Sequence, residues 1–157
     1  GSLLSPFGVA AIPPAIFGHL LPLFIQAVPG VIFNGDPPFS LWEHPPGVGR
    51  IPPHRSDAGT YLLAECFGCA TMTLIKDVDG LYERDPKEHP GARFIDEITV
   101  AELREMNLPT LPFDRSLLGL LERARLVTSI QIINGLEPDR LLPALRGERV
   151  GTIIRRD

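Results

Sequence analysis

Residues 71–87 read TMTLIKDVDGLYERDPK, an apolar β-rich run that leads directly into two acidic turns. Residues 71–76 predict a buried strand, and residues 77–80 predict the turn that ends it. Ligands of open α/β sheets bind beyond the carboxyl ends of the strands. Dense charge at such a point, with Tyr82 as a ring that can stack on a base, indicates a candidate ligand site. A solvated turn would also carry this many charges.

Strands and helices alternate on both sides of this stretch. Further strands are predicted at residues 30–33, 129–134 and 151–154. Helices are predicted at residues 58–67 with Ser56 or Asp57 as the N-cap, at 99–107 behind a capping box, at 113–126 with Asp114 as the cap, and at 139–145. The alternation predicts a single α/β domain over residues 1–157 with a largely parallel sheet.

The composition fits an ordinary globular protein and excludes several classes. The 157 residues are 44% hydrophobic and 22% charged, and the net charge of -4 without a basic stripe disfavours nucleic-acid binding. Many of the 17 prolines fall within residues 1–53, so long helices are not expected there. The apolar run at residues 15–28 is too short to span a membrane and is interpreted as buried core.

The two cysteines form a CFGC sequence at Cys66 and Cys69. Such a pair would suit a redox site or half of a zinc site. No second pair exists, and the thiols follow a helix instead of preceding one. We therefore favour two reduced structural thiols and a cytoplasmic protein.

A second candidate site lies at the start of the helix predicted from residue 58. Arg55, the hydroxyl of Ser56 and free backbone amides would suit an oxyanion or a phosphate. The long loop at residues 39–53 precedes them, and loops of this length tend to be functional. The alternative is that SDAG is only a good helix cap.

The string KDVDGLYERDPK, residues 76–87, resembles the nucleotide-binding motif of amino acid kinases of the uridylate kinase type. The downstream order of helix, strand, helix and strand is similar to that family. Upstream, DPP at residues 36–38 and RIPPHRSDAG at residues 50–59 resemble the molybdenum storage proteins within it.

The resemblance implies a three-layer αβα fold whose N-terminal portion is missing, because the family's first strand, with its lysine and paired glycines, has no counterpart in the chain. It implies ATP binding, with Tyr82 near adenine and Asp85 near the sugar, and Mg²⁺ as cofactor. The matching positions are Lys76, Asp77, Tyr82, Asp85, Pro86 and Lys87. Asp57 matches the acid at a helix start that follows the acceptor-side loop of the kinases. Whether phosphate transfer occurs depends on the missing phosphate loop.

The four histidines show no spacing typical of metal ligands, and each by itself fits a surface or hydrogen-bonding role. In a storage cavity histidines would bind an oxoanion cluster, and a cationic histidine would attract a polyanion as the pH falls. His44 and His54 are then the candidates, because they lie in the loop that looks functional.

Three functions follow as hypotheses. The first is a molybdate or tungstate storage subunit that binds ATP and Mg²⁺ and assembles into a closed cage. The second is a uridylate-type nucleotide monophosphate kinase, and the third is a catalytically silent assembly or regulatory module. In each case we expect an oligomer with a homologous subunit or the N-terminal half, and no nucleic-acid or membrane partner.

Overall fold

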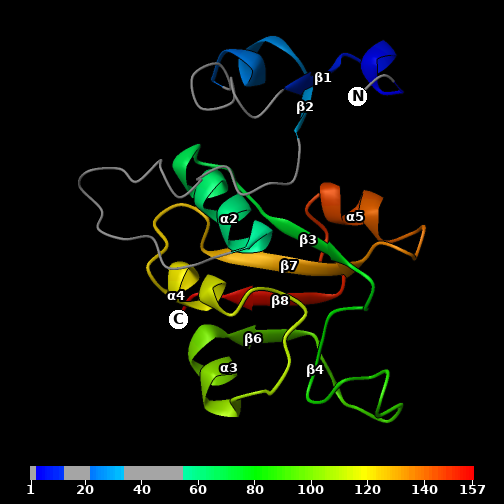
Figure 1. The fold of residues 1–157 in the computed structure, drawn as a ribbon, viewed down its shortest axis with the longest axis vertical. Coiled ribbons are helices and arrows are strands. Elements are labelled where there is room, and N and C mark those ends of the chain that lie inside the picture. The colour runs from blue at the N-terminus through cyan, green and yellow to red at the C-terminus, as the bar shows by residue number, and fades with distance from the viewer. Residues whose placement is uncertain (1–2, 13–21, 34–54) are drawn as a thin grey trace. The chain divides into compact units, whose positions relative to one another are not determined.

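The computed structural model describes residues 3–12, 22–33 and 55–157 (Figure 1). The chain divides into two compact units, Gly1–Thr60 and Tyr61–Asp157, and each is described by itself. Whether they form one domain stays a prediction. The loop at residues 39–53, with Trp42, His44 and its neighbours, lies outside the described residues, as do His19 and His54.

The first unit contains a two-stranded parallel sheet. A short 3₁₀ turn, η1 (Ser5–Phe7), precedes β1 (Val9–Ile12), which pairs with β2 (Gly30–Phe33), the strand predicted at these residues. Residues 22–27 are helical, but Leu23 and Ile25 are exposed. The interpretation of residues 15–28 as buried core is therefore wrong for Leu23 and Ile25, because the two short strands among the described residues of this unit offer too little surface to cover a helix on all sides.

The second unit is built on a four-stranded sheet. Its strands are β3 (Thr73–Lys76), β6 (Glu97–Thr99), β7 (Ser129–Asn134) and β8 (Thr152–Arg155), in the order β3-β7-β8-β6 (Figure 1). The pairs β3 with β7 and β6 with β8 are parallel, and the central pair β7 with β8 is antiparallel. A separate hairpin pairs β4 (Leu81–Tyr82) with β5 (Phe94–Ile95). This confirms the predicted α/β class with a largely parallel sheet.

Each predicted helix downstream of residue 55 is present, with shifted ends. The helices are α2 (Ser56–Cys66), α3 (Val100–Met106), α4 (Ser116–Glu122) and α5 (Leu141–Leu145). The capping box of α3 is confirmed, since Thr99 and Glu102 exchange side-chain and backbone hydrogen bonds. The cap of α2 is corrected: the carbonyl of Arg55 accepts the first helical bond, from the amide of Gly59, so Ser56 and Asp57 lie within the first turn.

Helix α4 is shorter than predicted at both ends. Arg115 occupies the N-cap position, so Asp114 is not the cap. Beyond Glu122 the chain leaves the helix, and three successive amides, those of Arg125, Leu126 and Val127, donate to the carboxylate of Glu65. The leucine spacing continues past this point, but a remote carboxylate takes the amides that a longer helix would use.

The core of the second unit lies between the sheet and its helices. Tyr61, Leu103, Leu117, Ile132 and Ile154 are among its fully buried members. The buried hydroxyl of Tyr61 donates to the carbonyl of Val127 at 2.8 Å, and burial raises the pKa of this phenol. A hydroxyl that leaves water needs such a partner.

No helix among the described residues is long and apolar enough to cross a membrane.

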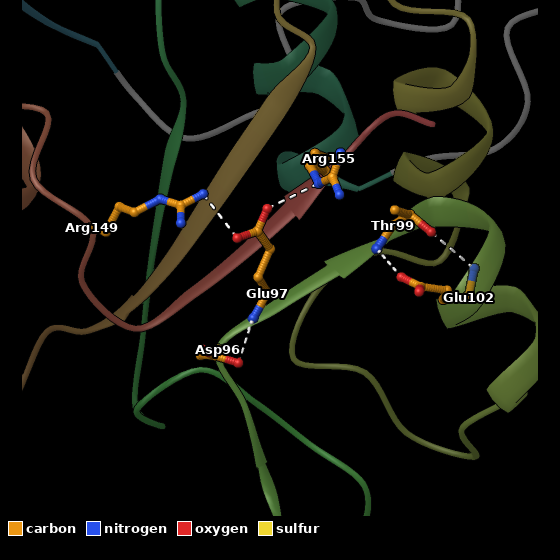
Figure 2. A network of polar contacts seen from close by, with 6 residues as sticks. All are labelled: Asp96, Glu97, Thr99, Glu102, Arg149 and Arg155. Carbon is orange, nitrogen blue, oxygen red and sulfur yellow. Dashed lines mark hydrogen bonds and ion pairs between the residues drawn. The ribbon is translucent and has the colours of Figure 1, made fainter.

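An ionic bridge joins β6 to β8 and to the loop before β8. Glu97 pairs with Arg149 and Arg155, each at 2.9 Å, and Figure 2 shows its carboxylate between the two guanidinium groups. Both arginine side chains are more than half exposed, so each pair contributes at most about 1 kcal/mol. The two pairs link β6 to the last residue of β8 and to the segment that precedes β8. Cys66 and Cys69 are free and exposed.

Candidate functional site

The turn at residues 77–80 is packed closely against β8. A Cβ added at Gly80 would lie 2.3 Å from the hydroxyl oxygen of Thr152, and one at Gly151 would lie 2.8 Å from the carbonyl oxygen of Asp79. Only residues without a side chain fit this approach of two backbone segments. The glycine of the VDG sequence is therefore required by a contact that links the turn to a strand 72 residues further along the chain, the difference between positions 152 and 80.

A cavity of about 190 Å³ opens beside this turn. The turn, the start of the hairpin and the following charged segment form most of it, and the loop between α3 and α4 lines the rest. Its lining residues are Asp77, Val78, Gly80, Leu81, Tyr82, Arg84, Asp85, Pro86, Lys87, Thr110, Leu111 and Pro112. Proline, valine and leucine side chains alternate here with carboxylates and cations, which suits a ligand that has both an apolar and a charged part.

The structure brings together five of the six residues predicted to bind nucleotide. Asp77, Tyr82, Asp85, Pro86 and Lys87 all line the cavity, whereas Lys76 belongs to β3 and is not among the lining residues. That these residues bind nucleotide stays a prediction.

The predicted anion-binding residues belong to a different unit. Arg55, Ser56 and Asp57 form the start of α2 within the first unit. Arg55 and Ser56 are exposed. The negative charge of Asp57 in the first turn favours the helix and opposes an anion at the same place. The predicted metal ligands His44 and His54 lie outside the described residues.

The charged end of the cavity is internally paired. The ammonium of Lys87 lies 2.6 Å from the carboxylate of Asp77, and the amide of Lys87 donates to the carboxylate of Asp85 at 2.8 Å. The hydrogen bond from Lys87 lowers the pKa of Asp77, and the same bond raises the pKa of Lys87. Both groups therefore stay charged at neutral pH. Because both are exposed, a ligand phosphate can compete for the lysine at small cost.

Tyr82 is held at two points. Its hydroxyl donates to the carboxylate of Asp79 at 3.1 Å, and its ring meets the ring of Phe94 edge to face at a centroid distance of 5.3 Å. Partial burial, followed by the hydrogen bond and the charge of Asp79, raises the pKa of this phenol. The ring is therefore neutral and oriented, as a stacking platform requires.

Two residues that support the site were not singled out from the sequence. Asn134, at the end of β7, donates to Asp79 at 2.9 Å. Thr152 is fully buried, and its hydroxyl accepts from the amide of Leu81 at 2.7 Å and donates to the carbonyl of Ile95. No local pattern marks either residue, although Asn134 ends one predicted strand and Thr152 lies within another. The loop residues Thr110 to Pro112 were missed for the same reason.

Comparison with known proteins gives three informative relatives. The molybdenum storage protein subunit beta of Azotobacter vinelandii is 44% identical over 154 residues, which is 98% of this chain and 57% of that protein. A uridylate kinase of Methanothermobacter thermautotrophicus is 38% identical over 113 residues, covering 68% of this chain and 49% of the kinase. The chain spans about half the length of these curated relatives.

The solved structure of the UMP kinase of Bacillus anthracis superposes with a TM-score of 0.69 at 21% identity, covering 95% of this chain and 58% of that one. At this identity the likeness shows the fold alone. The sequence profile of the amino acid kinase family matches residues 28–134, which include α2, the charged turn, the cavity and all of β7. The chain belongs to the amino acid kinase family.

Proposed function

We propose that this chain is a storage subunit for molybdate or tungstate that binds ATP with Mg²⁺ in the cavity beside residues 77–87. The observation that carries this proposal is the 44% identity with a molybdenum storage protein subunit over 98% of the chain. The match to the storage subunit covers 98% of the chain, whereas the match to the uridylate kinase covers 68% of it.

The cavity chemistry supports a nucleotide. The oriented ring of Tyr82 offers a face for adenine, with Leu111 and Pro112 as apolar walls. Lys87 and Arg84 are the cations that would meet phosphate oxygens. ATP would fit this division between an apolar and a charged half.

The carboxylates of the cavity suit the cation that accompanies ATP. Mg²⁺ in nucleotide sites is commonly held by one or two carboxylates together with the phosphates. Asp77 and Asp85 are the carboxylates that would take this part. The ion would supply charge neutralisation of the phosphates, and Asp77 would exchange its bond to Lys87 for it.

The oxoanion would be cargo. Arg55 and Ser56 at the start of α2 are its proposed contacts, and His44 and His54 its proposed cationic ligands at lower pH. Asp57 would hold the helix start in shape. We further propose that the protein works in the cytoplasm as an oligomer with a homologous subunit.

The second candidate is a uridylate-type kinase. It is favoured by the 38% identity with the uridylate kinase of Methanothermobacter thermautotrophicus over 113 residues. A silent assembly module of the same fold is the remaining alternative. These three functions differ in turnover and in cargo: a kinase phosphorylates UMP, a storage subunit retains metal, and a silent module does neither.

Elemental analysis of protein purified from its native source separates them. We expect molybdenum or tungsten well above one atom per chain, together with a second polypeptide or a homologous subunit in the intact-mass spectrum. Transfer of phosphate from Mg-ATP to UMP by preparations free of molybdenum and tungsten would establish the kinase instead. Absence of both metal and transfer would leave the assembly module.

A further inference from the structure

We propose that Asn134 is a positioning residue of the nucleotide cavity: it acts through Asp79 to fix the ring of Tyr82. The inference rests on the proposed binding of ATP. Asn134 does not line the cavity, so its effect on a ligand would be transmitted through this side chain.

The sheet brings Asn134 and Asp79 together. Strands β3 and β7 are parallel, and Lys76 is paired in register with Asn134, so both strands end at the same edge. The turn after β3 places Asp79 there, and the amide nitrogen Nδ2 of Asn134 donates to its Oδ1 at 2.9 Å. The contact joins residues 55 positions apart in the sequence.

The orientation of the Asn134 amide is itself fixed. Its Oδ1 accepts from the backbone amide of Leu136 at 2.9 Å, so its Nδ2 must face Asp79. Aspartate at position 134 would keep the acceptor for Leu136 but would place a second carboxylate against Asp79. The site therefore needs a side chain that accepts on one side and donates on the other.

The carboxylate of Asp79 links Asn134 to Tyr82 by two hydrogen bonds. One carboxylate oxygen accepts from Asn134 and the other accepts from the hydroxyl of Tyr82 at 3.1 Å. The ring of Phe94 packs edge to face with the Tyr82 ring. A carboxylate held by Asn134 thus fixes the tip of the ring, while Phe94 limits its rotation.

A fixed ring binds a base more tightly than a mobile one, because the entropy of ordering the side chain has already been lost before binding. Tyr82 is only partly buried, and its contacts with Asp79 and Phe94 are what orient it. Releasing Asp79 should therefore weaken stacking without removing any atom that touches the ligand.

The test uses a substitution and its reversal on the full chain. N134D changes one amide to a carboxylate of the same shape and removes the donor to Asp79. The exchange variant D79N/N134D restores one donor and one acceptor with the direction of the bond reversed. It also restores the original net charge, which controls for repulsion between an added carboxylate and the phosphates of ATP.

Two readouts are measured in each variant. In the ligand-free protein, NMR detects the nuclear Overhauser contact between the rings of Tyr82 and Phe94. Titration calorimetry then gives the affinity for Mg-ATP. We expect N134D to lose the ring contact and to bind Mg-ATP about tenfold more weakly, in the range of one lost stacking contact. The exchange variant should regain the contact and come within about twofold of the original affinity.

The outcomes separate this inference from the proposed function. If N134D keeps the ring contact, or if the exchange variant fails to regain it, Asn134 does not position Tyr82. If the unmodified chain binds no Mg-ATP while the ring contact follows the expected pattern, the positioning role stands and the nucleotide role is lost. Should N134D fold poorly, the exchange variant alone decides, since its ring contact must match that of the unmodified chain.

Discussion

Replacing Thr152 by valine should destabilise the second unit more than replacing it by serine. Thr152 is 0% exposed, and its hydroxyl joins β8 to both strands of the hairpin that carries Tyr82. Valine keeps the shape and removes the hydroxyl, which leaves the amide of Leu81 and the carbonyl of Ile95 without this partner. Serine keeps the hydroxyl and loses one methyl group.

The expected sizes follow from these two losses. An unsatisfied buried donor or acceptor costs about 1 to 3 kcal/mol, so valine should lower the free energy of unfolding by about 2 to 4 kcal/mol. One buried methyl group contributes about 0.8 kcal/mol, so serine should lower it by about 1 kcal/mol. With a urea dependence of about 2 kcal/mol per molar, the unfolding midpoint should fall by about 1 to 2 M for valine and about 0.5 M for serine.

Urea unfolding followed by circular dichroism measures both midpoints, and hydrogen exchange of the Leu81 amide locates the effect. We expect this amide to exchange faster in T152V and to stay protected in T152S. A scale based on apolar burial alone gives the reverse order, because valine is the more hydrophobic residue. A T152V midpoint equal to that of the unmodified protein, or above that of T152S, would refute the reasoning from the hydroxyl.

Three further changes test individual groups. Burial raises the pKa of Glu65, but hydrogen bonds from three backbone amides outweigh it and the net pKa is lowered. The stability that the Glu65 carboxylate adds should therefore be present at neutral pH and lost as the pH falls through that lowered pKa. The urea midpoints of the unmodified chain and of E65Q should then converge in acid. Partial burial and then Asp79 raise the pKa of Tyr82, so D79N should lower it. Absorbance titration near 295 nm, with Y82F as the control, measures the pKa of Tyr82. K87M should raise the pKa of Asp77. The melting temperature should change little, because both members of the pair are exposed. NMR titration of the Asp77 carboxyl carbon measures this pKa, and an unchanged pKa in K87M would mean that the 2.6 Å contact is absent in solution.

The local signals of the sequence predicted most of the second unit. Strand β7 was predicted at its observed bounds, and the capping box at Thr99 predicted the start of α3. Five nucleotide-binding candidates line one cavity because they lie within eleven consecutive positions, 77–87, around one turn. Neighbours in sequence stay neighbours in space across such a turn, so their proximity needed no knowledge of the sheet.

Errors arose where a remote group competes with a local pattern. The leucines near residue 126 keep a helical spacing, but Glu65 draws the amides of Arg125 to Val127 out of the helix. Leu23 and Ile25 are apolar, yet they are exposed in a unit whose described residues form two strands. The hydrophobicity of a residue indicates how much free energy its burial would contribute. Whether other segments provide enough surface to bury it cannot be read from the residue itself.

The sequence by itself predicted strands β2, β3, β7 and β8, helices α2 to α5, the turn after β3 and the resemblance to the family, whereas β6 and the hairpin of β4 and β5 were not predicted. Only the tertiary structure decided that β7 and β8 run antiparallel, that Asn134 meets Asp79, and that Thr152 supports the hairpin. Backbone propensity and side-chain periodicity act over a few residues, so they can be recognised in a short stretch of sequence. A hydrogen bond between residues 55 or 71 positions apart depends on strand order and register, and these are fixed when the core of the whole unit packs.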